Sequence, residues 1–204
     1  MVRRRMRLSG RRRWRRLGWG WRVIALAVVF GLLVAGTAGG LIWWDKARTE
    51  AERAEALGPM IERIAGEYGL DPALVRAVID AESSFDPKAV SDKGARGLMQ
   101  IMPIAQREVM RRHGLPDGDL FDPEYNLTLG CAYLRQLLTR FDGDLHLSLA
   151  AYHMGPTRTA RLRRKHPGLN GPQLVEEHAY RSTQAYVAAV LANYRQSHPD
   201  AAGR

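Results

Sequence analysis

The chain is poor in the residues that build covalent cross-links and metal sites. Cys131 is the one cysteine among 204 residues, so no disulfide can form within the chain. It falls on the apolar face of a predicted helix and is expected to be a small core residue. The six histidines are scattered singly, without the HExxH spacing of zinc peptidases. We therefore predict neither a metal site nor a cofactor.

Alternation of apolar and polar residues, the pattern of a half-buried strand, is also missing over any convincing length. Apolar residues instead recur three and four positions apart, which is the spacing of one helix face. Helix starts are expected at Asp71-Pro72, Pro103, Asp122-Pro123 and after Gly143, with a last helix over residues 179–195. The predicted fold class is all-α, with any sheet limited to a short ribbon around residues 97–102.

Acidic residues are absent from the first 22 positions, which contain ten arginines. Removing these ten from the 31 basic residues leaves 21, which equals the number of acidic residues. The formal net charge of +10 therefore belongs to the N-terminal tail, and the rest of the chain is neutral. This distribution disfavours a basic groove for nucleic acid, and we expect no nucleic-acid partner.

An uncharged apolar run, residues 23–42, follows the basic tail and has paired tryptophans on both sides. Twenty helical residues span about 30 Å, the thickness of the hydrocarbon core of a bilayer. The sequence predicts a single-pass signal anchor over residues 23–44, with the basic tail, residues 1–22, in the cytoplasm. The alternative is a signal peptide that is cleaved at the small residues 37–40, which would release the mature protein.

Residues 45–57 are rich in strong helix formers and alternate in charge sign, which predicts a solvated helical stalk. Gly58-Pro59 is expected to break this helix. The sequence then predicts one folded domain over residues 58–196 and a flexible tail over residues 197–204.

One acidic side chain is predicted to lie beside the core. Glu82 comes at the end of the helix that begins at Asp71, next to its apolar stripe, and a glycine-punctuated loop follows it. A carboxyl against apolar surface is costly to ionise, so its pKa rises and it can keep a proton to donate near neutral pH. This is the profile of a general acid. A lone glutamate in an arbitrary helix is more often solvated. The neighbouring residues therefore decide whether Glu82 is a general acid or an ordinary surface residue.

Three motifs supply that context. They read ESSFDP at residues 82–87, SDKGARGLMQIMP at residues 91–103 and AYHMGP at residues 151–156. In this order they resemble the motifs of the soluble lytic transglycosylase family, whose domain is lysozyme-like, and the resemblance extends over about residues 58–196. It implies cleavage of the β-1,4 bond between MurNAc and GlcNAc in peptidoglycan, with a 1,6-anhydro product. The predicted signal anchor and the cytoplasmic arginines put this domain in the periplasm, attached to the bacterial inner membrane.

The resemblance also assigns roles to single residues. Glu82 becomes the general acid and then the base, and no second catalytic carboxylate is used because the N-acetyl group and 6-hydroxyl of the substrate complete the displacement. Ser91 becomes a hydroxyl that orients the sugar or Glu82. Gln100 and Met102 line the groove, and Tyr152 hydrogen-bonds Glu82 or the substrate. The plain alternatives are a loop cap for Ser91 and packing for Met102 and Tyr152.

Two positions depart from the family pattern. His153 stands where the family has Asn, and Ser182 stands where it has an acid. Neutral imidazole offers a donor and an acceptor as Asn does, so we keep His153 among the substrate-binding residues. With its ordinary pKa of about 6.5, His153 would become cationic in mildly acidic medium. That charge would favour the Glu82 carboxylate and remove the proton that the reaction needs.

Two alternatives share the expected partner, the glycan strands of peptidoglycan. A lysozyme-like hydrolase would use a second carboxylate, and Asp86 and Asp92 are the nearest acids in sequence, although Asp86 before Pro87 is typical of a turn. A weakly active binding module would serve an envelope or secretion complex. The presence of Glu82 favours an active enzyme over that module.

Overall fold

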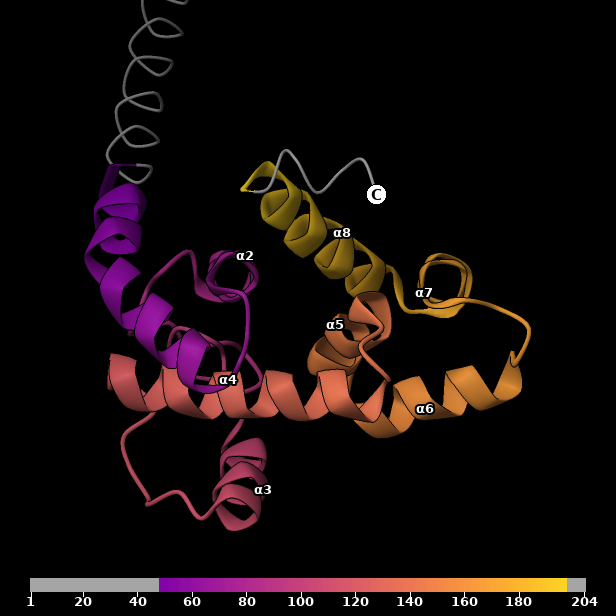
Figure 1. The fold of residues 1–204 in the computed structure, drawn as a ribbon, viewed down its shortest axis with the longest axis horizontal. Coiled ribbons are helices and arrows are strands. Elements are labelled where there is room, and N and C mark those ends of the chain that lie inside the picture. Colours follow the sequence, from indigo (N-terminus) through magenta and orange to yellow (C-terminus); the bar gives the residue numbers. More distant parts are fainter. Residues whose placement is uncertain (1–47, 198–204) are drawn as a thin grey trace, which may run out of the picture. The chain divides into compact units, whose positions relative to one another are not determined.

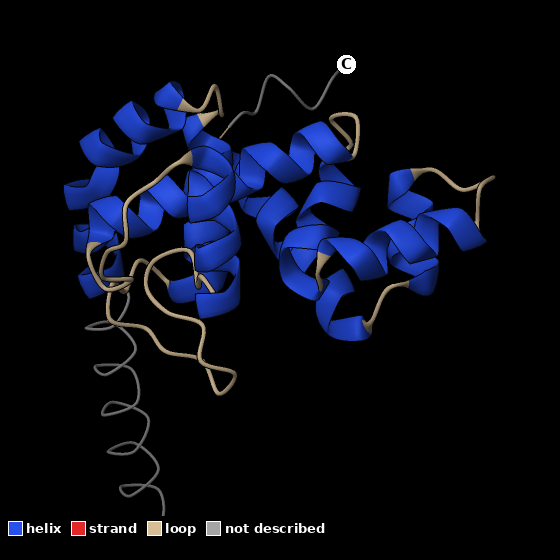
Figure 2. Cartoon of the chain, turned by 90° about the horizontal axis from the view of Figure 1, so that it is seen from below, coloured by secondary structure: helices blue, strands red, loops and turns tan. Residues whose placement is uncertain are grey.

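The computed structural model describes residues 48–197, and these form helices joined by loops, with no strand in this part of the chain (Figure 2). The fold is all-α as predicted, and the expected ribbon is reduced to isolated bridges that pair Arg96 with Val90 and with Ile101. The predicted anchor, residues 23–44, lies outside the described residues, as do the basic tail and the chain after Ser197. Within residues 48–197, no helix is long and apolar enough to cross a membrane.

Residues from Glu50 onward make up one compact unit. Helix 48–67 comes first, followed by α2 (Pro72–Ser83), α3 (Pro103–His113), α4 (Pro123–Arg140), α5 (Leu145–Met154), α6 (Pro156–Lys165), α7 (Gly171–His178) and α8 (Arg181–Gln196). The expected starts of α2 and α4 are confirmed, because the side chains of Asp71 and Asp122 accept hydrogen bonds from the first helical turn. Asp144 caps α5 in the same way.

Two helices, α6 and α7, are missing from the sequence prediction. α6 resembles a basic surface segment, since Thr159 is its one buried residue. α7 has only eight residues, yet its start carries a readable signal. Asn170 and Gln173 form a capping box, in which each side chain accepts a hydrogen bond from the backbone N–H of the other residue.

The predicted helix break at Gly58-Pro59 is wrong, because helix 48–67 runs through both residues. Arg76 of α2 donates to the carbonyl oxygen of Ala54 (3.1 Å), close to the turn in which Pro59 has no N–H to donate. Glycine at position 58 leaves room for this guanidinium, which an added Cβ would approach to 2.5 Å. Ala54 also packs against the core. The last part of the expected stalk therefore belongs to the folded domain.

Helix α5 lies at the centre of the domain and packs against α4, α6, α7 and α8 (Figure 1). Its residues Leu149 and Ala150 are fully buried, and Cys131 of α4 is buried in the same core, as expected. α2 packs against α8, and the hydroxyl of Tyr194 donates to Asp71 across this contact (2.8 Å). This bond fastens the start of α2 to the last turns of α8.

The loop between α2 and α3 is held by one buried amide. Asn126 of α4 is fully buried. Its Oδ1 accepts from the backbone N–H of Met99 (2.8 Å), and its Nδ2 donates to the carbonyl oxygens of Arg96 (2.9 Å) and Leu120 (2.8 Å). These backbone groups would be costly to bury unpaired. The amide therefore defines where the loop rests on α4.

Two glycines let this loop and α4 come close together. Gly97 has a φ of +74°, and an added Cβ would collide with the carbonyl of Leu120 and the side chain of Asn126. Gly130 lies one turn after Asn126 and faces the side chain of Met99, which occupies the space that a Cβ would need. A larger residue at either position would push the loop away from α4.

Asn126→Ala removes all three hydrogen bonds and leaves their partners buried. We expect this change to lower the free energy of unfolding by roughly 2–4 kcal/mol. Thr139→Ala, on the exposed side of the same helix, is the control and should change it by less than about 0.5 kcal/mol. Urea unfolding measures both values. Equal stability of the two variants would contradict the role given to Asn126.

Candidate active site

The six side chains predicted for the site meet at one cavity of about 430 Å³. The residues that line it are Glu82, Ser91, Asp92, Lys93, Ala95, Gln100, Met102, Tyr152 and His153. A second cavity, of about 370 Å³, shares Gln100, Met102, Tyr152 and His153 with the first and extends to residues 155–157 at the start of α6. The two cavities adjoin, and together we call them the groove.

Glu82 lies in the last turn of α2 and is partly buried. Burial raises the pKa of Glu82 from 4.5 to about 7, because the charged carboxylate loses its hydration. Near neutral pH a large share of the Glu82 carboxyls therefore hold a proton. A group that is to act as a general acid needs this state.

Tyr186 of α8 also belongs to the site, although helical spacing alone places it in the core. It is buried, and its hydroxyl lies near enough to Glu82 to lower the pKa of that carboxyl, which opposes the effect of burial. Among the described residues, the hydroxyl has no hydrogen-bond partner of good geometry, so this contact is a close approach. Burial raises the pKa of Tyr186 well above 10, and the hydroxyl keeps its proton. A buried tyrosine hydroxyl needs a polar partner. The expected burial of Tyr186 was therefore the sequence signal that could have placed it at a polar site.

The backbone beside Glu82 adopts conformations that are unusual for residues other than glycine. Ser84 (φ 49°) and Phe85 (φ 59°) follow α2 directly, and Gln100 (φ 48°) lines the same cavity as Glu82. Such conformations cost about 1–3 kcal/mol each and cluster at functional sites. The N–H of Ser84 donates to the carbonyl oxygen of Asp80 (3.0 Å) and ends the helix there. The chain thus turns away immediately after Glu82 and leaves its carboxyl at the groove.

Two hydroxyls fasten the loop of the groove to α2 and α5. Ser83 donates to the carbonyl oxygen of Leu98 (2.8 Å), and Tyr152 donates to that of Met99 (2.8 Å). Tyr152 was expected to hydrogen-bond Glu82 or the substrate, but its proton goes to the loop. Its place in the structure is that of a positioning residue at the wall of the groove.

The other predicted groove residues differ in whether their side chains already form hydrogen bonds within the loop or are exposed to a substrate. Ser91 accepts a hydrogen bond from the N–H of Ala95 (3.0 Å), as a loop cap does. The Nε2 of Gln100 donates to two carbonyl oxygens of its own loop (3.0 and 3.2 Å). Met102 precedes α3 and is 36% exposed, so it faces the groove and not the core.

His153 connects α5 with α8. Its Nδ1 lies 3.0 Å from the Oγ1 of Thr183, and its ring stacks on that of Tyr186 with centroids 4.8 Å apart. Partial burial, and next the charge of Lys93, lower the pKa of His153. The cation expected in mildly acidic medium therefore forms only at lower pH than predicted. Near neutrality His153 is an uncharged contact between the two helices.

Of the two acids considered as a second carboxylate, Asp92 lines the cavity and Asp86 does not. Asp86 accepts from the N–H of Lys88 (3.1 Å) and lies 3.7 Å from Arg53, which fits the turn role expected for it. Asp92 is exposed and stands next to Lys93 on the loop.

The described part of the chain contains no group of three or more His, Cys, Asp or Glu side chains that could hold a metal ion. Burial raises the pKa of the Cys131 thiol to about 12, so this thiol stays protonated and is a poor nucleophile.

Comparison with known proteins gives consistent matches. The family model "Transglycosylase SLT domain" matches residues 59–173. The soluble lytic murein transglycosylase of Escherichia coli (strain K12) is 30% identical over 166 residues, which cover 79% of this chain and 25% of that protein. The membrane-bound lytic murein transglycosylase C of Histophilus somni (strain 2336) is 41% identical over 96 residues, which cover 45% and 26%.

Among solved structures, an inactive mutant of the lytic transglycosylase Slt from Pseudomonas aeruginosa matches with a TM-score of 0.63 and 33% sequence identity. The match covers 68% of this chain and 24% of that one. The chain therefore spans about a quarter of the length of these relatives. Because the family model covers more than half of the 204 residues, the chain belongs to the family of transglycosylase SLT domains.

Proposed function

We propose that this domain is a peptidoglycan lytic transglycosylase, which cleaves the β-1,4 bond between MurNAc and GlcNAc and forms a 1,6-anhydro product. The observation that carries the proposal is a partly buried carboxyl, Glu82, with its pKa raised to about 7 in a groove. The lytic murein transglycosylases among the relatives support the substrate. A pure binding module would gain nothing from a carboxyl that is costly to ionise.

In the proposed reaction, protonated Glu82 gives its proton to the glycosidic oxygen while the bond from the anomeric carbon to that oxygen breaks. The 6-hydroxyl of the same sugar attacks the anomeric carbon. Glu82, now a carboxylate, takes the proton of this hydroxyl. One proton leaves and one returns, so the enzyme ends in its starting state. The Tyr186 hydroxyl favours the charged state of Glu82 between the two transfers.

The remaining groove residues divide into two groups. Ser91, Gln100 and Met102 line the first cavity with Glu82 and contact the glycan beside the cleaved bond. Tyr152 and His153 act through other residues. Tyr152 holds the loop at Met99, and the ring of His153 supports Tyr186.

A lysozyme-like hydrolase is the second candidate, and one observation favours it. Asp92 lines the same cavity as Glu82, and most glycosidases place two carboxylates at the cleaved bond. Asp92 is exposed on a loop beside Lys93, so its surroundings differ from those of Glu82. The two candidates share a substrate and differ in product.

The proposed enzyme is anchored in the inner membrane by residues 23–44, with its domain in the periplasm, where an envelope or secretion complex is a further partner. The ten arginines before the apolar run and the membrane-bound relatives support this topology. Protease added to spheroplasts should digest the domain and spare the N-terminus. A soluble mature form beginning near Gly39 would contradict the anchor.

Glu82→Gln keeps the shape of the side chain but cannot donate a proton. We expect cleavage to slow by about 10²–10⁴-fold, with binding to peptidoglycan retained. Asp86→Asn, which changes an acid outside the groove, is the control and should have a mild effect. Mass spectrometry of digested peptidoglycan should show anhydro ends. Reducing ends, together with equal inactivity of Asp92→Asn and Glu82→Gln, would favour the hydrolase.

The rate should also depend on pH through Glu82. Because the first step needs its protonated form, kcat/KM should fall as pH rises through about 7. The Tyr186 hydroxyl lowers the pKa of Glu82, so Tyr186→Phe should move this decline to higher pH. Tyr68→Phe, at the end of helix 48–67, is the control and should leave it in place. Identical profiles for Tyr186→Phe and the wild type would rule out the proposed contact.

A further inference from the structure

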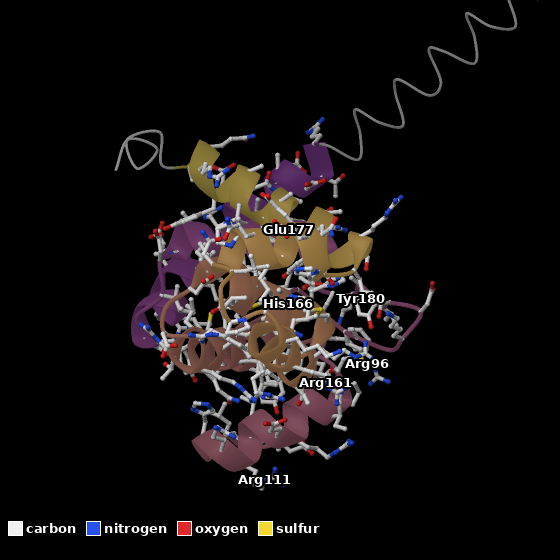
Figure 3. The ribbon with its side chains drawn as sticks, turned by 90° about the vertical axis from the view of Figure 1, so that its right-hand side faces the viewer. Arg96, Arg111, Arg161, His166, Glu177 and Tyr180 are labelled. Atoms are coloured by element: carbon white, nitrogen blue, oxygen red, sulfur yellow. The ribbon has the colours of Figure 1, made fainter. Side chains whose placement is uncertain are left out.

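Another cavity, of about 500 Å³, lies apart from the groove, between the end of α3 and the second half of α4. Figure 3 shows α3, which carries the labelled Arg111, on the opposite side of the domain from α8. The residues that line this cavity are Arg112, His113, Arg135, Gln136, Thr139 and Arg140. No acidic residue of the described chain is among them. Its volume is that of a site for a small molecule, and three guanidinium groups at its wall favour an anion.

One of these guanidinium groups is already held in place. The Nε of Arg135 donates to the carbonyl oxygen of Tyr68 (2.7 Å), and its Nη2 donates to that of Gly69. Gly69, with a φ of +59°, leaves room for the guanidinium because it has no Cβ. The Nη1 of Arg135 forms no hydrogen bond within residues 48–197. A planar group fixed by two backbone oxygens loses little freedom when it binds a ligand.

Arg112 and Arg140 supply the other two guanidinium groups. Arg112 lies 3.8 Å from Glu108 of the same helix, and this exposed pair contributes little. Within residues 48–197, Arg140 forms no ion pair. Both arginines lie in the last turn of their helix, where a cation is favoured by the helix dipole. The dipole does not account for Arg135, which comes before the last turn of α4.

A buried acceptor at the same cavity lacks a donor. Gln136 lines the cavity, and its Oε1 is buried without a hydrogen-bond partner in the part of the chain that the structure describes. Buried polar atoms are rarely left unpaired, because they lose their bonds to water. A hydroxyl of a bound ligand would supply the missing donor. The cavity thus offers donors for anionic oxygens and an acceptor for a hydroxyl.

We propose that this cavity binds the phosphate monoester of a small polyol, and we call it the phosphate cavity. The phosphate is held by Arg112, Arg135 and Arg140, and a polyol hydroxyl donates to Gln136. A phosphate monoester carries about 1.5 to 2 negative charges at pH 7, whereas a carboxylate or the diester of a lipid headgroup carries one. Three guanidinium groups match the larger charge and bind phosphate oxygens in pairs.

Calorimetry on the full chain in detergent, at fixed salt, tests the proposal with glycerol 3-phosphate, inorganic phosphate and glycerol. Glycerol 3-phosphate should bind about fivefold more tightly than inorganic phosphate, the effect of one added hydrogen bond, and glycerol should not bind measurably. Arg112→Ala combined with Arg140→Ala should weaken binding of both phosphates at least about tenfold, because hydrogen bonds between charged groups are lost. Gln136→Met should remove only the advantage of glycerol 3-phosphate over inorganic phosphate.

The matched control is Arg111→Ala, because this exposed arginine precedes Arg112 but does not line the cavity. It should leave the affinities unchanged. Arg112 and Arg140 are exposed, so thermal unfolding of the double variant should match that of the wild type. Absence of binding, equal affinity of the wild type for the two phosphates, or an equal loss in the control and the double variant would overturn the proposal. Tighter binding of bis(glycerol) phosphate, a diester like a lipid headgroup, than of glycerol 3-phosphate would also overturn it. No probe is a glycan, so the result does not depend on the proposed cleavage.

Discussion

The buried amide of Asn126 fixes the loop on which the groove depends. This side chain of α4 forms hydrogen bonds with the backbone of Arg96 and Met99. Hydroxyls of α2 and α5 donate hydrogen bonds to the carbonyl oxygens of Leu98 and Met99. Three helices thus hold Arg96, Leu98 and Met99, and these polar backbone groups are paired. Since Glu82 precedes Ser83, and Gln100 follows Met99, the same bonds set the position of the acid relative to the groove. The position of the catalytic carboxyl at the groove therefore depends on how the loop between α2 and α3 packs.

That packing places Glu82 where its charge is unfavourable. A folded-state pKa of about 7, against 4.5 for the free side chain, means that ionising Glu82 weakens the fold by roughly 3 kcal/mol. The folded state binds this proton more tightly than the unfolded one. The loss of stability therefore develops as pH rises from about 4.5 and is complete above about 7. Residues Ser84, Phe85 and Gln100 add backbone strain at the same place. The ionised carboxylate and the strained backbone thus lower the stability of the fold at the active site. This is common where function needs a strained arrangement.

Much of this architecture could be read from the sequence, because its signals are local. Aspartate caps predicted the starts of α2 and α4, and helical spacing predicted the all-α class. The three motifs contain every residue that lines the first cavity, whereas Tyr133 and Glu108 of the second cavity lie outside them. Signals that depend on tertiary contacts were missed or misjudged. Helix 48–67 continues through Pro59 because Arg76 and the core support it. Tyr186 reaches Glu82 and Tyr152 binds Met99 across more than 50 positions of sequence, which no spacing rule detects.

The central claim is that burial keeps Glu82 protonated near neutral pH, and titration of that one carboxyl tests it most directly. Carbon-13 NMR of chain labelled in glutamate follows the side-chain carboxyl carbon with pH, and Glu82→Gln assigns its signal by removing it. The structure predicts a midpoint near 7. A midpoint near 4.5, the value of a solvated glutamate, would show that the carboxyl is already ionised at neutral pH and would contradict its role as the acid.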